Sequence, residues 1–210
     1  MKKIIVTLFL AGASLYSFAQ TQFAVGLKAG PNFAKIDTDA GAQANYESRT
    51  GWHAGAFLLV KGEKFGFQPE IIFSQQGSKF QYSGSPDLEA NFSYVNIPLI
   101  FKLYTIGGIN LQVGPQIGLL TSAEREDYAS GQGGVITKED IKDDLKKTDI
   151  SLALGVGVDL PLGFTLDGRY NWGLSDNDDG AVTDSGAPIG QIKNQVWQIS
   201  VGYKLFRSEN

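Results

Sequence analysis

The chain has no cysteine, a single histidine and little charge. Charged residues make up 19% of its 210 residues, whereas about 25% is usual in soluble domains. Without cysteine the chain forms no disulfide and cannot carry a lipid on an N-terminal cysteine. Its formal net charge of −4 argues against a nucleic-acid partner, which would need a basic face. We therefore expect a fold that backbone hydrogen bonds close without covalent links.

Long apolar runs are also scarce, and the clearest one lies at the N-terminus. Lys2-Lys3 precedes an apolar stretch from Ile4 to Leu15, which small residues follow at Ser17 and Ala19. A basic start, a short apolar core and small residues before the cut are typical of a secretory signal peptide. The stretch is shorter than the roughly 20 residues that a membrane-spanning helix needs. We expect residues 1–19 to be a signal peptide and 20–210 to be one mature domain.

Most of the remaining chain alternates between apolar and small polar residues. Between 109 and 119, the odd positions are Ile, Leu, Val, Pro, Ile and Leu, and the even positions are Asn, Gln, Gly, Gln and Gly. Since side chains of a strand point to opposite faces in turn, this segment has one apolar and one polar face. Similar patterns predict eight strands, at 22–33, 51–60, 65–75, 91–104, 109–120, 148–160, 164–174 and 194–206.

The gaps between these strands alternate between long and short. The short gaps are 61–64, 105–108 and 161–163, and the other four are far longer. Outer-membrane barrels have short periplasmic turns and long outer loops, and their strands need ~9–11 residues. A sheet edge cannot be left open in hydrocarbon. We therefore predict an all-β fold, an eight-stranded antiparallel up-and-down transmembrane β-barrel with both termini in the periplasm.

The alternative is a soluble barrel whose apolar face points inward. The polar face favours the membrane barrel, because it consists mostly of Gly, Gln, Asn, Ser and Ala, which fit a narrow lumen.

Aromatic residues also gather at two levels. We expect an outer-interface band of Trp52, Trp172 and Trp197, and an opposite band of Phe23, Phe65, Tyr104, Phe164 and Phe206. Proline removes a ladder hydrogen bond, so we expect bulges or rim positions at Pro31, Pro69, Pro98 and Pro115.

Several motifs resemble those of a known family. They are Gly26–Phe33, Phe67–Ile71, Tyr94–Lys102, Gly155–Val158, Arg169-Tyr170 and Gly173-Leu174. In these segments the chain resembles the outer-membrane β-barrel, PorT-like porin family that is common in Bacteroidetes. The resemblance implies an outer-membrane barrel, and the family name suggests pores and secretion. Leu205-Phe206 resembles the terminal aromatic signal read by the barrel assembly machinery, although four further residues follow it.

The predicted strands turn seven charged side chains toward the lumen. They are Lys28, Glu70, Lys102, Asp159, Asp167, Arg169 and Lys204. The lumen of an eight-stranded barrel is just wide enough for its own side chains. Four positive and three negative groups nearly cancel, which favours an internal ion-pair network that fills the lumen. A proton or ion path is the alternative.

Three further features are weaker candidates. His53 lies near the outer rim, but no Ser-His-Asp or metal spacing surrounds it, so we expect a lone histidine in a polar wall. Ser175–Gly180 resembles half of a calcium loop, but lacks its first Asp and last Glu. In the longest gap, Thr137–Lys147 has a capping pattern that predicts a short helix over the outer mouth.

These observations favour a non-catalytic integral outer-membrane protein with a structural, envelope-supporting or loop-mediated binding role. A narrow porin-like channel for small solutes or ions and a barrel enzyme acting on lipid or peptide are the alternatives. We expect no cofactor and no metal site. The expected partners are outer-membrane lipid, lipopolysaccharide and, during biogenesis, the barrel assembly machinery, and we expect a monomer.

Overall fold

The computed structural model describes residues 21–38, 45–81, 88–128, 135–140, 148–175 and 192–208. Nine strands form in this part of the chain. They are β1 (Gln22–Thr38), β2 (Asn45–Lys61), β3 (Phe65–Gln81), β4 (Leu88–Tyr104), β5 (Ile109–Tyr128), β6 (Val135–Asp140), β7 (Thr148–Asp159), β8 (Phe164–Gly173) and β9 (Ile192–Arg207). The predicted signal peptide lies outside the described residues.

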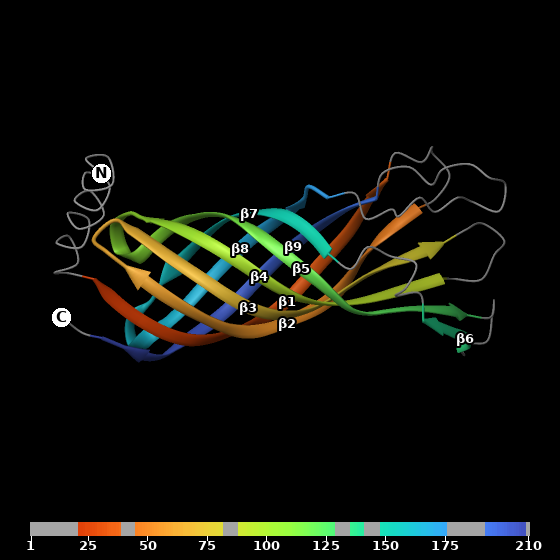
Figure 1. Cartoon of the computed structure of the whole chain (residues 1–210), viewed down its shortest axis with the longest axis horizontal. Helices are drawn as coiled ribbons and strands as arrows, with labels where there is room; N and C mark the ends of the chain where they lie inside the picture. The colour runs from red at the N-terminus through yellow and green to blue at the C-terminus, as the bar shows by residue number, and fades with distance from the viewer. Residues whose placement is uncertain are drawn as a thin grey trace, which may run out of the picture.

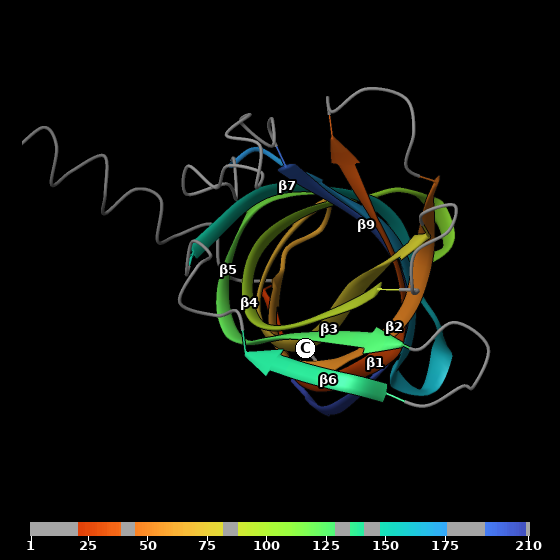
Figure 2. The same ribbon diagram turned by 90° about the vertical axis from the view of Figure 1, so that its right-hand side faces the viewer.

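Eight of these strands close into an antiparallel barrel (Figures 1 and 2). Around the ring the order is β1, β2, β3, β4, β5, β7, β8 and β9, and β1 pairs with β9 to complete it. β6 pairs with β5 and lies outside the ring. The predicted closed eight-stranded barrel is therefore confirmed.

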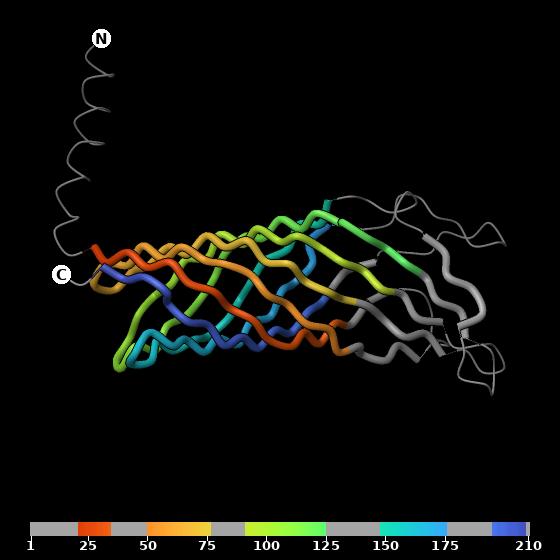
Figure 3. Tube along the Cα trace, turned by 90° about the horizontal axis from the view of Figure 1, so that it is seen from below, coloured from red at the N-terminus to blue at the C-terminus, as the bar shows by residue number. Residues whose placement is uncertain are grey.

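One end of the barrel, here called the turn end, carries three tight connections. They are residues 62–64, the 3-10 turn Ile106–Gly108 and the 3-10 turn Pro161–Gly163. Gly107 and Gly163 have φ angles of 70° and 93°, which side chains other than glycine rarely adopt. The start of β1 and the end of β9 lie at the same end (Figure 3).

At the other end, here called the extended end, several strands are longer than the alternating pattern predicts. The β2–β3 ladder reaches Asn45 and Gln81, and the β4–β5 ladder reaches Leu88 and Asp127. β5 has 20 residues, whereas β8 on the far side of the ring has 10. The prediction ended the strands where the apolar alternation ends, but ladder pairing continues through polar sequence. One side of the barrel wall is consequently taller than the other (Figure 1).

The helix predicted to start at Thr137 is wrong over its first four residues. Residues 137–140 belong to β6, which pairs with β5 at Glu124–Asp127. The β-branched run Val135-Ile136-Thr137 suits a strand, and the protruding edge of β5 offers it a partner. The rest of that segment, 141–147, and loop residues 176–191 lie outside the described residues. No helix in the described ranges is long and apolar enough to cross a membrane.

The two faces of the wall differ as predicted. Leu111 and Val113 are 50% and 46% exposed on the outer face, whereas Gln112 between them is 4% exposed and points inward. Trp52, Trp172 and Trp197 also point outward. Tyr104 does not belong to the opposite aromatic band, because it shares the inward face of β4 and is only 6% exposed.

The four prolines do not mark bulges. At each one, the ladder to one neighbouring strand is interrupted for two residues, while the ladder to the other neighbour includes the proline. Next to Pro31, for example, the β1–β9 ladder is interrupted between Ala29 and Asn32 without a change of register. Proline lacks the backbone N–H that would donate to one neighbouring strand, but its pairing with the other neighbour is kept. A mid-strand proline is therefore tolerated without a change of register.

Candidate functional site in the barrel lumen

The centre of the lumen holds a bidentate ion pair. Nη1 and Nη2 of Arg169 donate to Oε2 and Oε1 of Glu70 at 2.8 and 2.7 Å. Both residues are at most 3% exposed. Gln68 donates a further hydrogen bond of 2.6 Å to Glu70. Two parallel charge-assisted bonds make this the strongest kind of contact between the two groups.

Asp167 is the second anionic centre, and it shares its partners with the first. It accepts from Lys28 at 3.2 Å and from the amide of Gln112 at 2.5 Å. The Gln112 carbonyl oxygen accepts in turn from Nε of Arg169 at 2.6 Å. Gln112 thereby bridges the two centres and orients the guanidinium.

A third cluster lies nearer the turn end. Asp159 accepts from Lys204 at 2.6 Å and from the Tyr104 hydroxyl at 3.2 Å. The ammonium of Lys102 lies between the clusters, 4.0 Å from Asp159 and 3.7 Å from Asp167. Lys102 Nζ and Asp159 Oδ1 are buried without a hydrogen-bond partner among the described residues.

These contacts place all seven predicted lumen charges in one continuous chain. Lys28 completes it, because its ammonium lies 3.5 Å from Glu70 as well as 3.2 Å from Asp167. The charges are shielded from the apolar outer face and nearly neutralise one another, as buried charges require. The residues come from β1, β3, β4, β7, β8 and β9, so the chain of contacts braces most of the ring.

Sequence reasoning missed a second polar cluster around His53. Its Nδ1 lies 2.7 Å from Oδ1 of Asn32, and its Nε2 lies 2.7 Å from Oγ of Ser200. The Asn32 amide nitrogen faces the backbone carbonyls of Trp52 and Gln75, which only accept hydrogen bonds. Asn32 therefore presents its oxygen to His53, so Nδ1 carries the proton and Ser200 donates to Nε2.

This serine–histidine–asparagine order has the proton arrangement of a nucleophilic relay. Its burial opposes that use, because His53 and Ser200 are each 1% exposed and leave no surface for an acyl substrate. In the sequence, Asn32, His53 and Ser200 all occupy positions at which the alternating pattern turns the side chain toward the lumen. What the sequence hides is the strand register that brings β1, β2 and β9 together at this level.

A family model and one solved structure with a TM-score above 0.5 support this architecture. Neisserial surface protein A has a structure that aligns with a TM-score of 0.51 at 11% identity, over 86% of this chain and 97% of that chain. The attachment invasion locus protein of Yersinia pestis aligns with a TM-score of 0.48 at 16% identity, over 90% and 99% of the two chains. No curated protein sequence matches the chain. Residues 18–179 match the outer membrane protein beta-barrel domain, which covers most of the chain. The chain therefore belongs to this family of integral outer-membrane β-barrel proteins.

Proposed function

We propose that this protein is a closed, non-catalytic barrel that anchors a polar surface to the outer membrane. Its role is to support the envelope or to bind a partner through its outer loops. The observation that carries the proposal is the filled lumen, in which charged side chains contact one another across the barrel axis.

The ion pair between Arg169 and Glu70 is the main obstacle to transport. It joins β8 to β3, which lie opposite each other in the ring with three strands between them on either side. A hydrated ion would have to separate two buried, doubly hydrogen-bonded charges, which is costly in a medium of low dielectric. The narrow-channel alternative requires this pair to open.

The extended end is the proposed binding surface. There the β2–β3 and β4–β5 ladders continue into sequence rich in polar residues and in charged residues of both signs, beyond the apolar part of the wall. Trp52, Trp172 and Trp197 would mark the outer lipid boundary below this polar extension. In this orientation both termini are periplasmic and the extended end faces outward.

Conductance across planar lipid bilayers tests the closed lumen. We expect the purified wild-type barrel to give no steady channel openings. The double variant Glu70→Ala/Arg169→Ala, which removes both halves of the central pair, should give openings of small conductance. Glu63→Ala, in an exposed turn, is the matched control and should behave as wild type. Regular openings of the wild-type barrel would replace this proposal with the narrow channel.

A further inference from the structure

We propose that two connections at the turn end, residues 105–109 and 160–164, dip into the adjacent lipid leaflet and anchor the barrel there. We call them the anchor turns. Ile106 and Leu162 lie at their tips and are 91% and 78% exposed, the highest exposed fractions of any large apolar side chain among the described residues. The proposal holds for either orientation of the barrel and does not depend on whether the lumen is closed.

The anchor turns are neighbours in the ring. They join β4 to β5 and β7 to β8, and β5 pairs with β7 from Ile109 and Val158 onward. A Cβ on Gly108 would overlap the carbonyl oxygen of Asp159, so the first turn packs against the end of β7. Figure 3 shows the green and teal turns together on one side of the rim, away from the two chain ends. The two tips therefore lie on the same side of the barrel.

Hydrogen bonds close both anchor turns in the same way. The amide of Thr105 donates to the carbonyl of Ile109 at 2.7 Å, and the amide of Leu160 donates to the carbonyl of Phe164 at 2.8 Å. Each turn is thus closed across its base by one backbone hydrogen bond. This closure leaves the tip projecting beyond the strand ladder.

Leu162 has a strained backbone. Its φ and ψ angles are 64° and 7°, and it is the one residue other than glycine with a positive φ in the described ranges. The left-handed region is unfavourable for a bulky side chain, whereas glycine adopts it freely, as Gly107 does in the other anchor turn. Packing within the barrel does not explain the leucine, because its side chain is exposed. A strained and exposed apolar residue points to a contact outside the barrel.

The surface around the tips is uncharged and continuous with the outer wall. Residues 103–109 and 160–166 include no charged residue. Ile109 and Phe164, the first residues of β5 and β8, are about half exposed on the outer face. The exposed apolar surface therefore runs from the wall to the tips without a break. Because the outer wall of a barrel of this family lies in lipid, the same lipid layer is the occupant that fits the tips.

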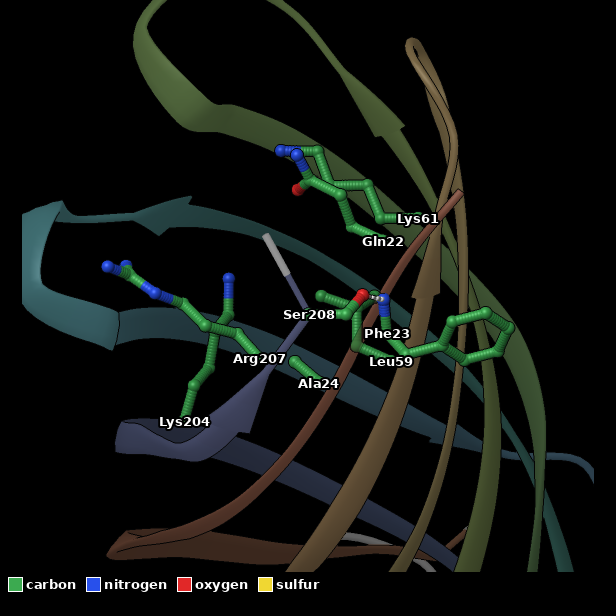
Figure 4. Close-up of a pocket in the computed structure, with 8 residues that line it drawn as sticks. All are labelled: Gln22, Phe23, Ala24, Leu59, Lys61, Lys204, Arg207 and Ser208. Carbon is green, nitrogen blue, oxygen red and sulfur yellow. Dashed lines mark hydrogen bonds between the residues drawn. The ribbon is translucent and has the colours of Figure 1, made fainter. Parts of the chain in front are cut away.

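The rest of the rim has a different character. The third turn, 62–64, carries the exposed Glu63. Where β1, β2 and β9 meet, Lys61, Lys204 and Arg207 line the opening (Figure 4). These groups suit water, because charged side chains are costly in hydrocarbon. One side of the rim thus fits lipid and the other fits water, so the anchor turns should lie deeper in the bilayer than the 62–64 turn.

Site-directed spin labelling tests the anchor, because the chain has no native cysteine. Ile106→Cys, Leu162→Cys and Glu63→Cys are each labelled with a nitroxide, and the full-length barrel is reconstituted in phosphatidylcholine vesicles. Oxygen concentrates in lipid and a nickel chelate stays in water, so power saturation with each reports the surroundings of the label. We expect the labels at 106 and 162 to collide mainly with oxygen, like a Val113→Cys label on the outer wall. The label at 63 should collide mainly with the nickel chelate.

A reporter label then shows whether the two side chains themselves hold the turns in lipid. A nitroxide on Leu160→Cys should shift toward the nickel chelate when Ile106→Asn and Leu162→Asn are combined. Glu63→Gln is the matched control and should not shift it, and heat-dependent gel mobility shows that each variant is folded. Labels at 106 and 162 as accessible to nickel as the label at 63, or an unshifted reporter, would overturn the proposal. Spin–spin broadening between copies would also overturn it, because a second chain would then cover the turns.

Discussion

Arg169 and Glu70 are 99 residues apart in the chain, yet two hydrogen bonds of 2.7 and 2.8 Å join them across the barrel. They stand on β8 and β3, which share no ladder. The pair therefore braces two opposite walls that backbone hydrogen bonds cannot connect. Lys28 and Gln112 reach the same two residues from β1 and β5, so four strands meet at one point.

Removing the carboxylate from this pair should strongly destabilise the barrel. In Glu70→Ala the guanidinium of Arg169 stays buried without its anion, and such a loss typically costs about 3–5 kcal/mol. We expect this decrease in the free energy of unfolding, measured by urea titration in lipid vesicles with tryptophan fluorescence. The exposed Glu63→Ala control should change it little, and an equal effect of the two variants would contradict the bracing role.

The cluster around His53 should contribute stability rather than chemistry. His53→Ala leaves the buried Ser200 hydroxyl without its acceptor, at a cost of about 1–3 kcal/mol, whereas Oδ1 of Asn32 keeps the amide of Gln198 as a donor. The urea midpoint should fall accordingly. A stable variant with an unchanged midpoint would show that these hydrogen bonds are dispensable.

A serine-directed fluorophosphonate probe separates this structural role from a catalytic relay. We expect no labelling of the folded wild-type barrel, because Ser200 is buried. Labelling that disappears in both Ser200→Ala and His53→Ala would show an accessible, activated serine and would revive the barrel-enzyme alternative.

Gly114 should not tolerate even a methyl group. A Cβ at this inward position would overlap the backbone carbonyl of Leu99 on β4. Gly114→Ala should therefore lower the unfolding free energy by about 1–3 kcal/mol, which is typical of overpacking. Gly168→Ala is the matched control, because nothing lies within 4 Å of the added atom. Comparable stability of the two variants would argue against close strand contact at Gly114.

The absence of cysteine makes the orientation directly measurable. We expect a membrane-impermeant maleimide to label Asp178→Cys on intact cells, because the long connections face outward in the proposed orientation. Glu63→Cys, in a tight turn at the other end, should react only after the cells are broken. The opposite labelling pattern would invert the barrel.

Much of the fold follows from the period of two along each strand. That period places Lys28 and Arg169 inside and Trp197 outside, because a strand side chain has only two directions to choose from. The same rule should have placed Tyr104 inside, beside Lys102 on its strand, but the position of Tyr104 at a strand end suggested an interface aromatic. For Tyr104 the alternation along the strand decides the direction of the side chain, although the residue lies at a strand end. Its hydroxyl donates to Asp159 inside the barrel.

Partners across the lumen could not be predicted in this way. The inward residue that contacts Glu70 is determined by the register between each pair of intervening strands. No local sequence pattern encodes the combined effect of these registers. The position of a strand end beyond the apolar region could not be predicted either, because ladder hydrogen bonds also form between polar residues. This is why residues 76–81 and 121–128 were predicted as gaps, and why Thr137 was predicted to begin a helix.

The seam between β1 and β9 has a consequence for biogenesis. The amide of Ser208 donates to the carbonyl of Phe23 at 2.8 Å, so the last described residue of the chain holds the beginning of the barrel. No intermediate with fewer strands satisfies both edges of the sheet, and an open edge is not tolerated in lipid. A chain that lacked β9 would leave β1 and β8 as two edge strands with unpaired backbone groups. β9 is therefore needed before the sheet can lie in the bilayer without an open edge.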